Sequence, residues 1–294
     1  MEPPRGAVRS GFVAVAGRPN VGKSTLVNAL CGGKVAIVSD KPHTTRRRIF
    51  GVANGDDFQL VLVDLPGFQR PFDPLTQRMQ RTVDSSFEDI DAVLFVLSAR
   101  ERIGAGDTFI ARRVFALGLP VVIALNKVDR LKPAHIASQM QTAARLGDFD
   151  ALHPVSAVTK DGVGELRGDL VQLLPESEQL YFPRDLRTDQ TETEQIGELV
   201  REKALQLTRE EVPHSISVEV DELEDKLVRA FVLVETGSQK QILVGKRGAM
   251  IREIGTRARP EIEALLGRAV FLELVVKVRP RWRRDEAQLE RLGL

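Results

Sequence analysis

The feature that most constrains the fold is a glycine-rich loop near the amino terminus, Gly17-Arg18-Pro19-Asn20-Val21-Gly22-Lys23-Ser24-Thr25. An apolar run over residues 12–16 precedes this loop, and a helix-forming run over residues 26–30 follows it. A strand, glycine loop and helix in this order form a phosphate cradle, because the glycines let backbone N–H groups turn onto an anion at the positive end of the helix. The pattern predicts a nucleoside triphosphate site in which Lys23 reaches the β- and γ-phosphates and Ser24 ligates Mg²⁺.

Length and charge limit the remaining possibilities. The chain has 294 residues, which predicts two domains at about 150 residues each. Its net charge is only +1, so binding to an anionic partner requires a local cationic patch. The single cysteine, Cys31, has no internal partner for a disulfide, as is usual in a reducing cytosol. No apolar run approaches the roughly 20 residues that span a bilayer, and we expect a cytoplasmic protein.

Two further segments in the first half of the chain are expected to lie near the γ-phosphate of a bound nucleotide. Residues 34–48 read as an exposed loop, and residues 49–53 and 58–63 read as the two strands of a hairpin. The second strand runs into Asp64-Leu65-Pro66-Gly67. An aspartate at the carboxyl end of a buried strand is well placed to hold Mg²⁺, usually through water, and the Gly67 N–H is expected to contact the γ-phosphate.

The base is expected to bind at the ends of later strands. Residues 92–97 and 121–125 are apolar runs typical of buried parallel strands, and the second ends in Asn126-Lys127-Val128-Asp129. The Asp129 carboxylate accepts hydrogen bonds only, so it selects the N1–H and amino group of guanine over adenine. We expect Asn126 to brace the loop and the Lys127 stem to lie across the base. Ser156-Ala157, followed by Val158, is expected to offer backbone N–H groups to guanine O6.

The second half predicts helix, strand, strand, helix, helix and strand. The segments are 196–207, 216–220, 227–235, 239–244, 249–266 and 270–278, and Pro260 indicates either a kink in the fifth segment or two helices that meet there. The loop Gly245-Lys246-Arg247-Gly248 joins the two adjacent helices. Its glycines allow close approach to nucleic-acid phosphates, which its two cations neutralise. Ile242, Val244 and Ile251 are either an apolar floor for single-stranded bases or ordinary core residues.

Other cations extend this predicted nucleic-acid surface. Arg252 follows the loop, and Lys277 and Arg281 come from a cluster that also contains Trp282. A tryptophan among cations suits base stacking and phosphate contact, although a solvated charged face is the alternative for the terminal arginines.

The ordered motifs resemble those of the translation-factor-related GTPases. Gly17 to Ser24 together with His43-Thr44-Thr45-Arg46-Arg47 look most like the Era subfamily. The resemblance implies an α/β fold: a P-loop GTPase domain with a mixed, mostly parallel sheet flanked by helices, followed by an α+β type II KH domain. It divides the chain into a GTPase domain (1–178), a linker (179–193) that Tyr181-Phe182-Pro183 matches, a KH domain (194–280) and a basic tail (281–294).

The same resemblance implies a function. GTP and Mg²⁺ are the expected ligands, with Thr45, or failing that Thr44, closing on the metal; Lys23, Thr45 and Gly67 are the expected catalytic residues. The KH domain is expected to grip the 3′ end of small-subunit ribosomal RNA during maturation of the 30S subunit. The resemblance also implies possible contact with the inner face of the bacterial membrane, and a monomer is expected. GTP is expected to change how the KH domain presents its groove.

Hydrolysis is expected to be slow. Phe68 occupies the position where many small GTPases carry a glutamine that orients the attacking water, and a phenylalanine cannot hydrogen-bond a water. Asn20 suggests that K⁺ assists in place of an arginine finger, as in related GTPases. Two other functions remain open: a GTPase that acts on proteins or membranes and does not use its KH-like domain for RNA, and an RNA-binding assembly factor that never turns over its nucleotide.

Overall fold

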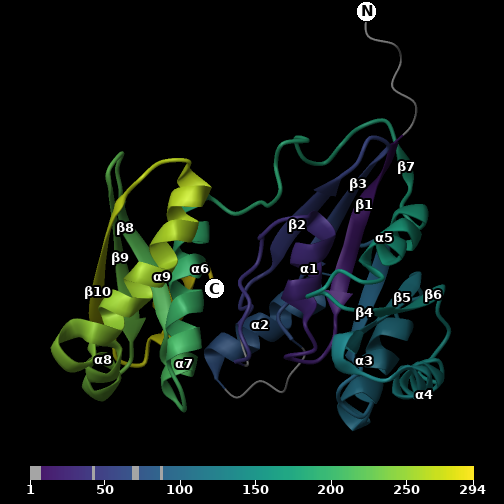
Figure 1. Cartoon of the computed structure of the whole chain (residues 1–294), viewed down its shortest axis with the longest axis horizontal. Coiled ribbons are helices and arrows are strands. Elements are labelled where there is room, and N and C mark those ends of the chain that lie inside the picture. Colours follow the sequence, from purple (N-terminus) through teal and green to yellow (C-terminus); the bar gives the residue numbers. More distant parts are fainter. Residues whose placement is uncertain (1–7, 42–43, 68–72, 87–88) are drawn as a thin grey trace, which may run out of the picture. The chain divides into compact units, whose positions relative to one another are not determined.

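The structure is a computed structural model that describes residues 8–41, 44–67, 73–86 and 89–294 (Figure 1). The chain forms two compact units. Of the described residues, those within 1–36, 45–70 and 79–189 form the first unit, and those within 37–44, 71–78 and 190–294 form the second. Phe68 and His43 lie outside the described residues, so the expectation of slow hydrolysis that rests on Phe68 stays a prediction.

A mixed, mostly parallel sheet forms the centre of the first unit. Its order is β2-β3-β1-β4-β5-β6, with β7 paired to β1. Strands β2 and β7 are antiparallel to their neighbours, and the other pairs are parallel. The described strands are β1 Val8–Ala16, β2 Ile49–Asn54, β3 Phe58–Asp64, β4 Ala92–Ser98, β5 Val121–Asn126, β6 Ala151–Val155 and β7 Glu176–Ser177. This arrangement confirms the predicted sheet.

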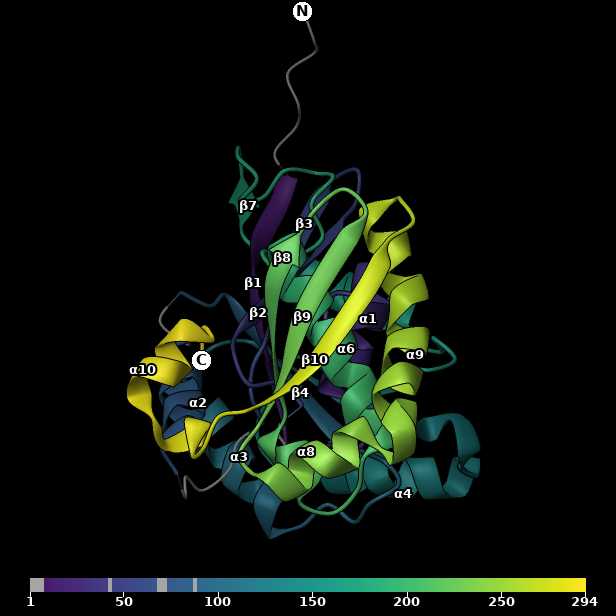
Figure 2. The same ribbon diagram turned by 90° about the vertical axis from the view of Figure 1, so that its left-hand side faces the viewer.

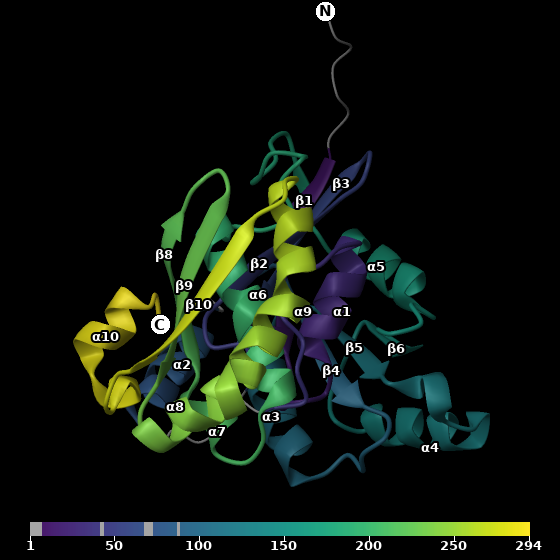
Figure 3. The same cartoon turned by 60° about the vertical axis from the view of Figure 1, so that its left-hand side comes forward.

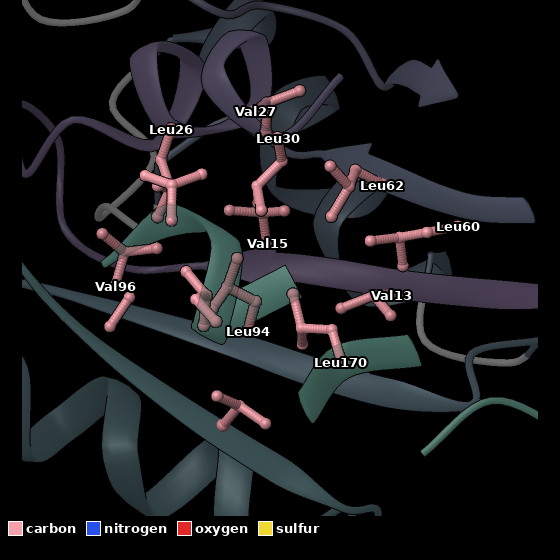
Figure 4. Packing of buried hydrophobic residues seen from close by; sticks show 14 of the residues in the cluster. Val13, Val15, Leu26, Val27, Leu30, Leu60, Leu62, Leu94, Val96 and Leu170 are labelled. Atoms are coloured by element: carbon pink, nitrogen blue, oxygen red, sulfur yellow. The ribbon is translucent and has the colours of Figure 1, made fainter. Parts of the chain in front are cut away.

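Helices cover both faces of this sheet because its central strands are apolar on both sides. Leu94 and Val96 of β4 pack into a cluster with residues of α1 and α5, whereas Phe95 and Leu97 pack with residues of α3 and α4 on the other face. Figure 4 shows the first cluster, where Leu26 and Leu30 of α1 point toward the strands. The helical segments are α1 Lys23–Cys31, α2 Pro74–Ser85, α3 Ala105–Phe115, η1 Val128–Arg130, α4 Pro133–Ala143 and α5 Val163–Gln172.

The segment predicted as a linker packs on the sheet of the first unit. The Tyr181 ring lies 4.6 Å from the Phe12 ring, centroid to centroid, so an aromatic contact anchors this segment on β1. Gln59 hydrogen-bonds both the N–H and the C=O of Phe182, at 2.9 and 2.8 Å. Further along, the Val52 N–H donates to the Arg187 carbonyl at 2.8 Å. The bond between Val52 and Arg187 covers part of the edge of β2, which would otherwise be open to another strand.

The second unit is built on a three-stranded sheet of its own, in the order β10-β9-β8 (Figure 2). Strand β9 is antiparallel to β8 and parallel to β10, and α6 and α9 pack against one face through residues such as Val200, Val232 and Ile254 (Figure 3). The elements are α6 Glu192–Leu207, α7 Val212–Ser215, β8 Ser217–Leu223, β9 Leu227–Val234, α8 Gly237–Val244, η2 Lys246–Gly248, α9 Ala249–Leu266, β10 Phe271–Val278, η3 Trp282–Arg284 and α10 Glu286–Arg291. This confirms the predicted α+β fold.

Helix α9 continues through Pro260 as one helix, so the alternative of two helices meeting there is wrong. Proline removes the hydrogen bond to the carbonyl four residues earlier, which belongs to Thr256. Both Pro260 and Thr256 are exposed, so water can satisfy that carbonyl.

The end of the chain differs from the expected basic tail. Trp282 is fully buried, and its Nε1–H donates to the Ser215 carbonyl at 2.9 Å. Leu289 of α10 is also fully buried. The expectation that Trp282 stacks on bases is therefore wrong: its ring is part of the packing of the second unit. Among the described residues, no helix is both long and apolar enough to cross a membrane.

Candidate functional site

The glycine-rich loop connects the end of β1 to the start of α1, as the sequence predicts. Gly17 has φ of +152°, and a Cβ there would lie 2.5 Å from the Val96 carbonyl oxygen. Gly22 has φ of +99°, and a Cβ there would collide with Nδ2 of Asn126. Both positions therefore require glycine for conformation and for space. At the tip of the loop, Asn20 also has a positive φ of 63° and is exposed.

Lys23 folds back over this loop. Its Nζ donates to the carbonyl oxygens of Gly17 and Arg18, at 3.2 and 3.1 Å. Burial lowers the pKa of Lys23 to about 8, and the nearby Asp64 carboxylate only partly offsets this. A buried ammonium in a ring of backbone groups is stabilised by an anion, which is the property that a phosphate site needs.

Arg18 does not direct its side chain into the cradle. Its Nε donates to Asp107 at 2.7 Å, and its Nη2 donates to Glu101 at 2.9 Å. Asp107 is buried in the first turn of α3. The loop is thus tied to α3 by an ion pair, and the predicted role of Arg18 in a phosphate site is left to its backbone, because its charge is paired elsewhere.

Three predicted metal ligands meet beside the cradle. Ser24 Oγ donates to Asp64 Oδ2 at 2.7 Å, and Thr45 Oγ1 lies 3.0 Å from Ser24 Oγ and 3.3 Å from the same carboxylate oxygen. The Thr44 hydroxyl instead donates to the Lys41 carbonyl at 2.7 Å. Of the two threonines left open by the sequence, Thr45 is therefore the one at this cluster.

The donor set fits Mg²⁺. Asp64 is fully buried, and burial raises the pKa of its carboxyl while Lys23 and the two hydroxyl groups lower it. Its second oxygen, Oδ1, has no hydrogen-bond partner among the described residues. A buried carboxylate oxygen without a partner is costly, and Mg²⁺ prefers carboxylate, hydroxyl and water oxygens. Gly67, three residues after Asp64, lies against the phosphate loop, since a Cβ there would come within 3.1 Å of the Pro19 nitrogen.

Asn126 holds the base-recognition segments together, as expected. Its Oδ1 accepts from the N–H groups of Lys127 and Ala157, at 2.8 and 3.0 Å, and its Nδ2 donates to the Val21 carbonyl at 3.0 Å. One side chain thus joins the phosphate loop to two other loops of the site. Lys127 has φ of 71°, and its Nζ contacts the Asn20 carbonyl.

The donors expected for guanine O6 are already used within the chain. The Ser156 N–H donates to the Asp161 carbonyl at 3.0 Å, and the Ala157 N–H donates to Asn126. Guanine O6 would have to share these donors, so the roles of Ser156, Ala157 and the exposed Val158 stay predictions.

Asp129 accepts from Ser156 Oγ at 3.1 Å and from Arg100 Nη2 at 3.0 Å. Sequence reasoning missed Arg100, since no motif surrounds it.

The loop predicted to grip RNA lies between α8 and α9. Gly245 and Gly248 have φ of 70° and 79°, and Lys246 and Arg247 are exposed. A Cβ on Gly245 would come within 2.8 Å of the Met250 nitrogen, so a side chain is excluded there. The loop therefore presents two cations on a backbone that only glycine can close.

The apolar residues beside this loop differ in exposure, which bears on whether they form a floor for bases or part of the core. Ile242 is 49% exposed, whereas Val244 and Ile251 are half-buried and pack against the core of the second unit. Arg252 and Arg281 are exposed. Lys277 lies over the Phe231 ring, 2.9 Å from its centroid, so this cation already has an aromatic partner. A contribution of Lys277 to RNA binding must include that ring.

The low pKa of Lys23 predicts how nucleotide affinity depends on pH. A phosphate stabilises the ammonium, so binding requires a proton once the free protein loses it above about pH 8. The dissociation constant for GDP, measured by calorimetry, should rise by up to about tenfold per pH unit above that value. Lys23→Arg is the control, because arginine stays charged; the same slope in wild type and variant would contradict this assignment.

Comparisons with known proteins agree with the architecture. Residues 12–127 match the 50S ribosome-binding GTPase family and residues 211–283 match the KH domain family. A crystal structure of Era in complex with MgGDPNP and nucleotides 1506–1542 of 16S ribosomal RNA is 38% identical, with a TM-score of 0.93, over 97% of this chain and 99% of that one. A point variant of Aquifex aeolicus Era bound to GDP·AlF4⁻ is 37% identical, with a TM-score of 0.91, over 97% and 99%. The chain belongs to the Era family of GTPases.

Proposed function

We propose that this GTPase is a switch that binds the 3′ end of small-subunit ribosomal RNA through its KH domain and assists maturation of the 30S subunit. The observation that carries the proposal is the meeting of Ser24, Thr45 and Asp64. It joins the phosphate loop to the loop before β2 and to the end of β3, so these segments can respond together to one ligand. The similarity of the whole chain to Era solved with MgGDPNP and ribosomal RNA supports the RNA partner.

Each residue then has a defined task in hydrolysis. Lys23 and the backbone of residues 17–25 hold the phosphates, and Asp129 selects guanine. Ser24, Thr45 and Asp64 would hold Mg²⁺, which would supply positive charge to neutralise the phosphate oxygens. Gly67 lies against Pro19 of the phosphate loop, and its N–H is the donor that we propose for the γ-phosphate. Leu65 and Pro66 are buried and fix the segment that carries Gly67.

Contacts inside the second unit support coupling between nucleotide and KH domain. Arg201 of α6 donates to the Thr44 carbonyl, and Glu202 accepts from the Val38 N–H at 2.8 Å. Thr44 immediately precedes Thr45 at the metal cluster. If Thr45 changes position when the metal site fills or empties, the bond between the Thr44 carbonyl and α6 would be affected, and RNA affinity would then follow the nucleotide state.

Coupling between nucleotide binding and RNA binding is reciprocal, so it can be measured through either ligand. If GTP tightens RNA binding, RNA tightens GTP binding by the same factor, typically about 5- to 150-fold. We expect an oligonucleotide with the ribosomal 3′ end to bind the GTP-analogue form more tightly than the GDP form, by fluorescence anisotropy. Arg201→Ala should reduce this ratio toward one. Equal RNA affinity of the two wild-type forms would defeat the proposal.

Reversing the charge of the loop between α8 and α9 tests whether the protein binds RNA or is instead a GTPase that acts on proteins or membranes. Replacing Lys246 and Arg247 by aspartate should abolish oligonucleotide binding, because two phosphate-neutralising charges are reversed. Basal hydrolysis should not change. Replacing Arg257 and Arg259 of α9 by aspartate makes the same change in net charge and is the control. Equal loss in both variants would show a general charge effect and no specific grip.

Turnover separates a switch from an RNA-binding factor whose nucleotide is structural. In a single-turnover assay with the full chain, we expect slow release of phosphate that the ribosomal 3′ end accelerates. K⁺ at the exposed Asn20 loop should raise the rate above that in Na⁺. Equal rates in the two salts would remove K⁺ from the proposal, and no phosphate release in any condition would contradict the switch.

A cytoplasmic, monomeric protein with peripheral contact to the inner membrane remains a prediction of the family resemblance.

A further inference from the structure

A short loop after β4 lies against the nucleotide site, although none of the recognised motifs includes it. The loop begins at Ala99, whose N–H donates to the Asn126 carbonyl at 2.8 Å. Two side chains of α4 hold its other side: His135 Nε2 lies 3.2 Å from the Ala99 carbonyl, and Gln139 Nε2 donates to the Glu101 carbonyl at 3.1 Å. Its backbone is thus fixed to the end of β5 and to α4.

The two residues that follow Ala99 reach both halves of the site. Glu101 accepts from Arg18 of the phosphate loop at 2.9 Å. Arg100 donates from Nη2 to Oδ2 of Asp129 at 3.0 Å. A fixed backbone carrying one anion and one cation therefore connects the phosphate loop with the carboxylate expected to recognise the base.

The Asp129 carboxylate has one internal donor on each oxygen. Ser156 Oγ donates to Oδ1 at 3.1 Å, and Arg100 donates to Oδ2. An ionised carboxylate offers about four lone-pair positions, so each oxygen keeps one for a ligand. Guanine presents two parallel donors, N1–H and the 2-amino group, which match those two positions. The internal donors and the base can thus be bound together.

The internal donors also fix the plane of the carboxylate. The terminal torsion of an aspartate is broad, so an unsupported carboxylate samples many orientations. A donor on each oxygen removes this freedom before the base arrives, and such preorganisation raises affinity. Arg130 cannot do the same: its Nε lies 3.8 Å from Oδ2, and its side chain is 82% exposed.

We propose that Arg100 is a positioning residue for guanine recognition, which orients the Asp129 carboxylate from the β4–α3 loop. The proposal rests on the proposed role of Asp129 in the nucleotide site. Arg100 does not touch the base; it acts through Asp129, and its removal should weaken the two base contacts that need a correctly oriented carboxylate.

The test compares GDP with inosine diphosphate, which lacks the 2-amino group. In Arg100→Ala, the affinity for GDP should fall about tenfold by calorimetry, equivalent to about 1.4 kcal/mol. Affinity for inosine diphosphate should fall less, so that the ratio of the two dissociation constants shrinks. Arg100→Lys should restore part of the ratio, since an ammonium can still donate to Oδ2. Arg130→Ala removes the same charge and should change either affinity less than twofold.

Other outcomes overturn the inference. Tighter GDP binding by Arg100→Ala would make Arg100 a competitor of guanine. Equal losses for both nucleotides, or equal effects of the Arg100 and Arg130 changes, would leave only a structural or general charge effect. Asp129→Asn tells the two proposals apart. If it leaves the nucleotide ratio unchanged, Asp129 does not recognise the base and both fall; if it abolishes the ratio while Arg100→Ala does not change it, only the role of Arg100 falls.

Discussion

The buried Asp64 carboxylate is the interaction on which the rest of the nucleotide site depends. A carboxylate with no solvent exposure is unfavourable unless charges and donors surround it. Here Lys23 supplies the opposite charge, and the Ser24 and Thr45 hydroxyl groups bond one oxygen. The other oxygen has no partner among the described residues, which suits a cation. Because these polar neighbours come from two segments, the start of α1 and the loop before β2, a ligand at Asp64 changes the contacts of both.

The first unit was largely predictable because its motifs lie where strands end. An apolar run of five to seven residues is typical of a strand buried inside a sheet that is covered on both faces, and the residues after such parallel strands lie at one edge of the sheet. Asp64, Asn126 and Ser156 follow this rule. The glycine positions of the phosphate loop were also predictable, because Gly17 and Gly22 have backbone conformations and close neighbours that a side chain would not tolerate.

Long-range partners were not predictable, because sequence shows the type of a side chain and not what faces it. Trp282 among arginines has the composition of a stacking surface, yet its ring is fully buried and bonds Ser215. Arg18 sits inside a phosphate-binding motif, yet its guanidinium pairs with Asp107. Arg100 has no motif at all, and its contact with Asp129 exists only because the loop after β4 meets the loop after β5.

Charge pairing explains how a chain of net charge +1 can still present a surface for RNA. Many cations of the second unit are held by carboxylates: Arg229 by Glu222 and Glu273, and Arg257 by Glu253. Binding RNA with these residues would first require breaking an ion pair. Lys246, Arg247, Arg252 and Arg281 are exposed and take part in no ion pair within the described part of the chain. Phosphates could be neutralised there without that loss, so the proposed RNA affinity is expected to concentrate at the glycine loop although the net charge is small.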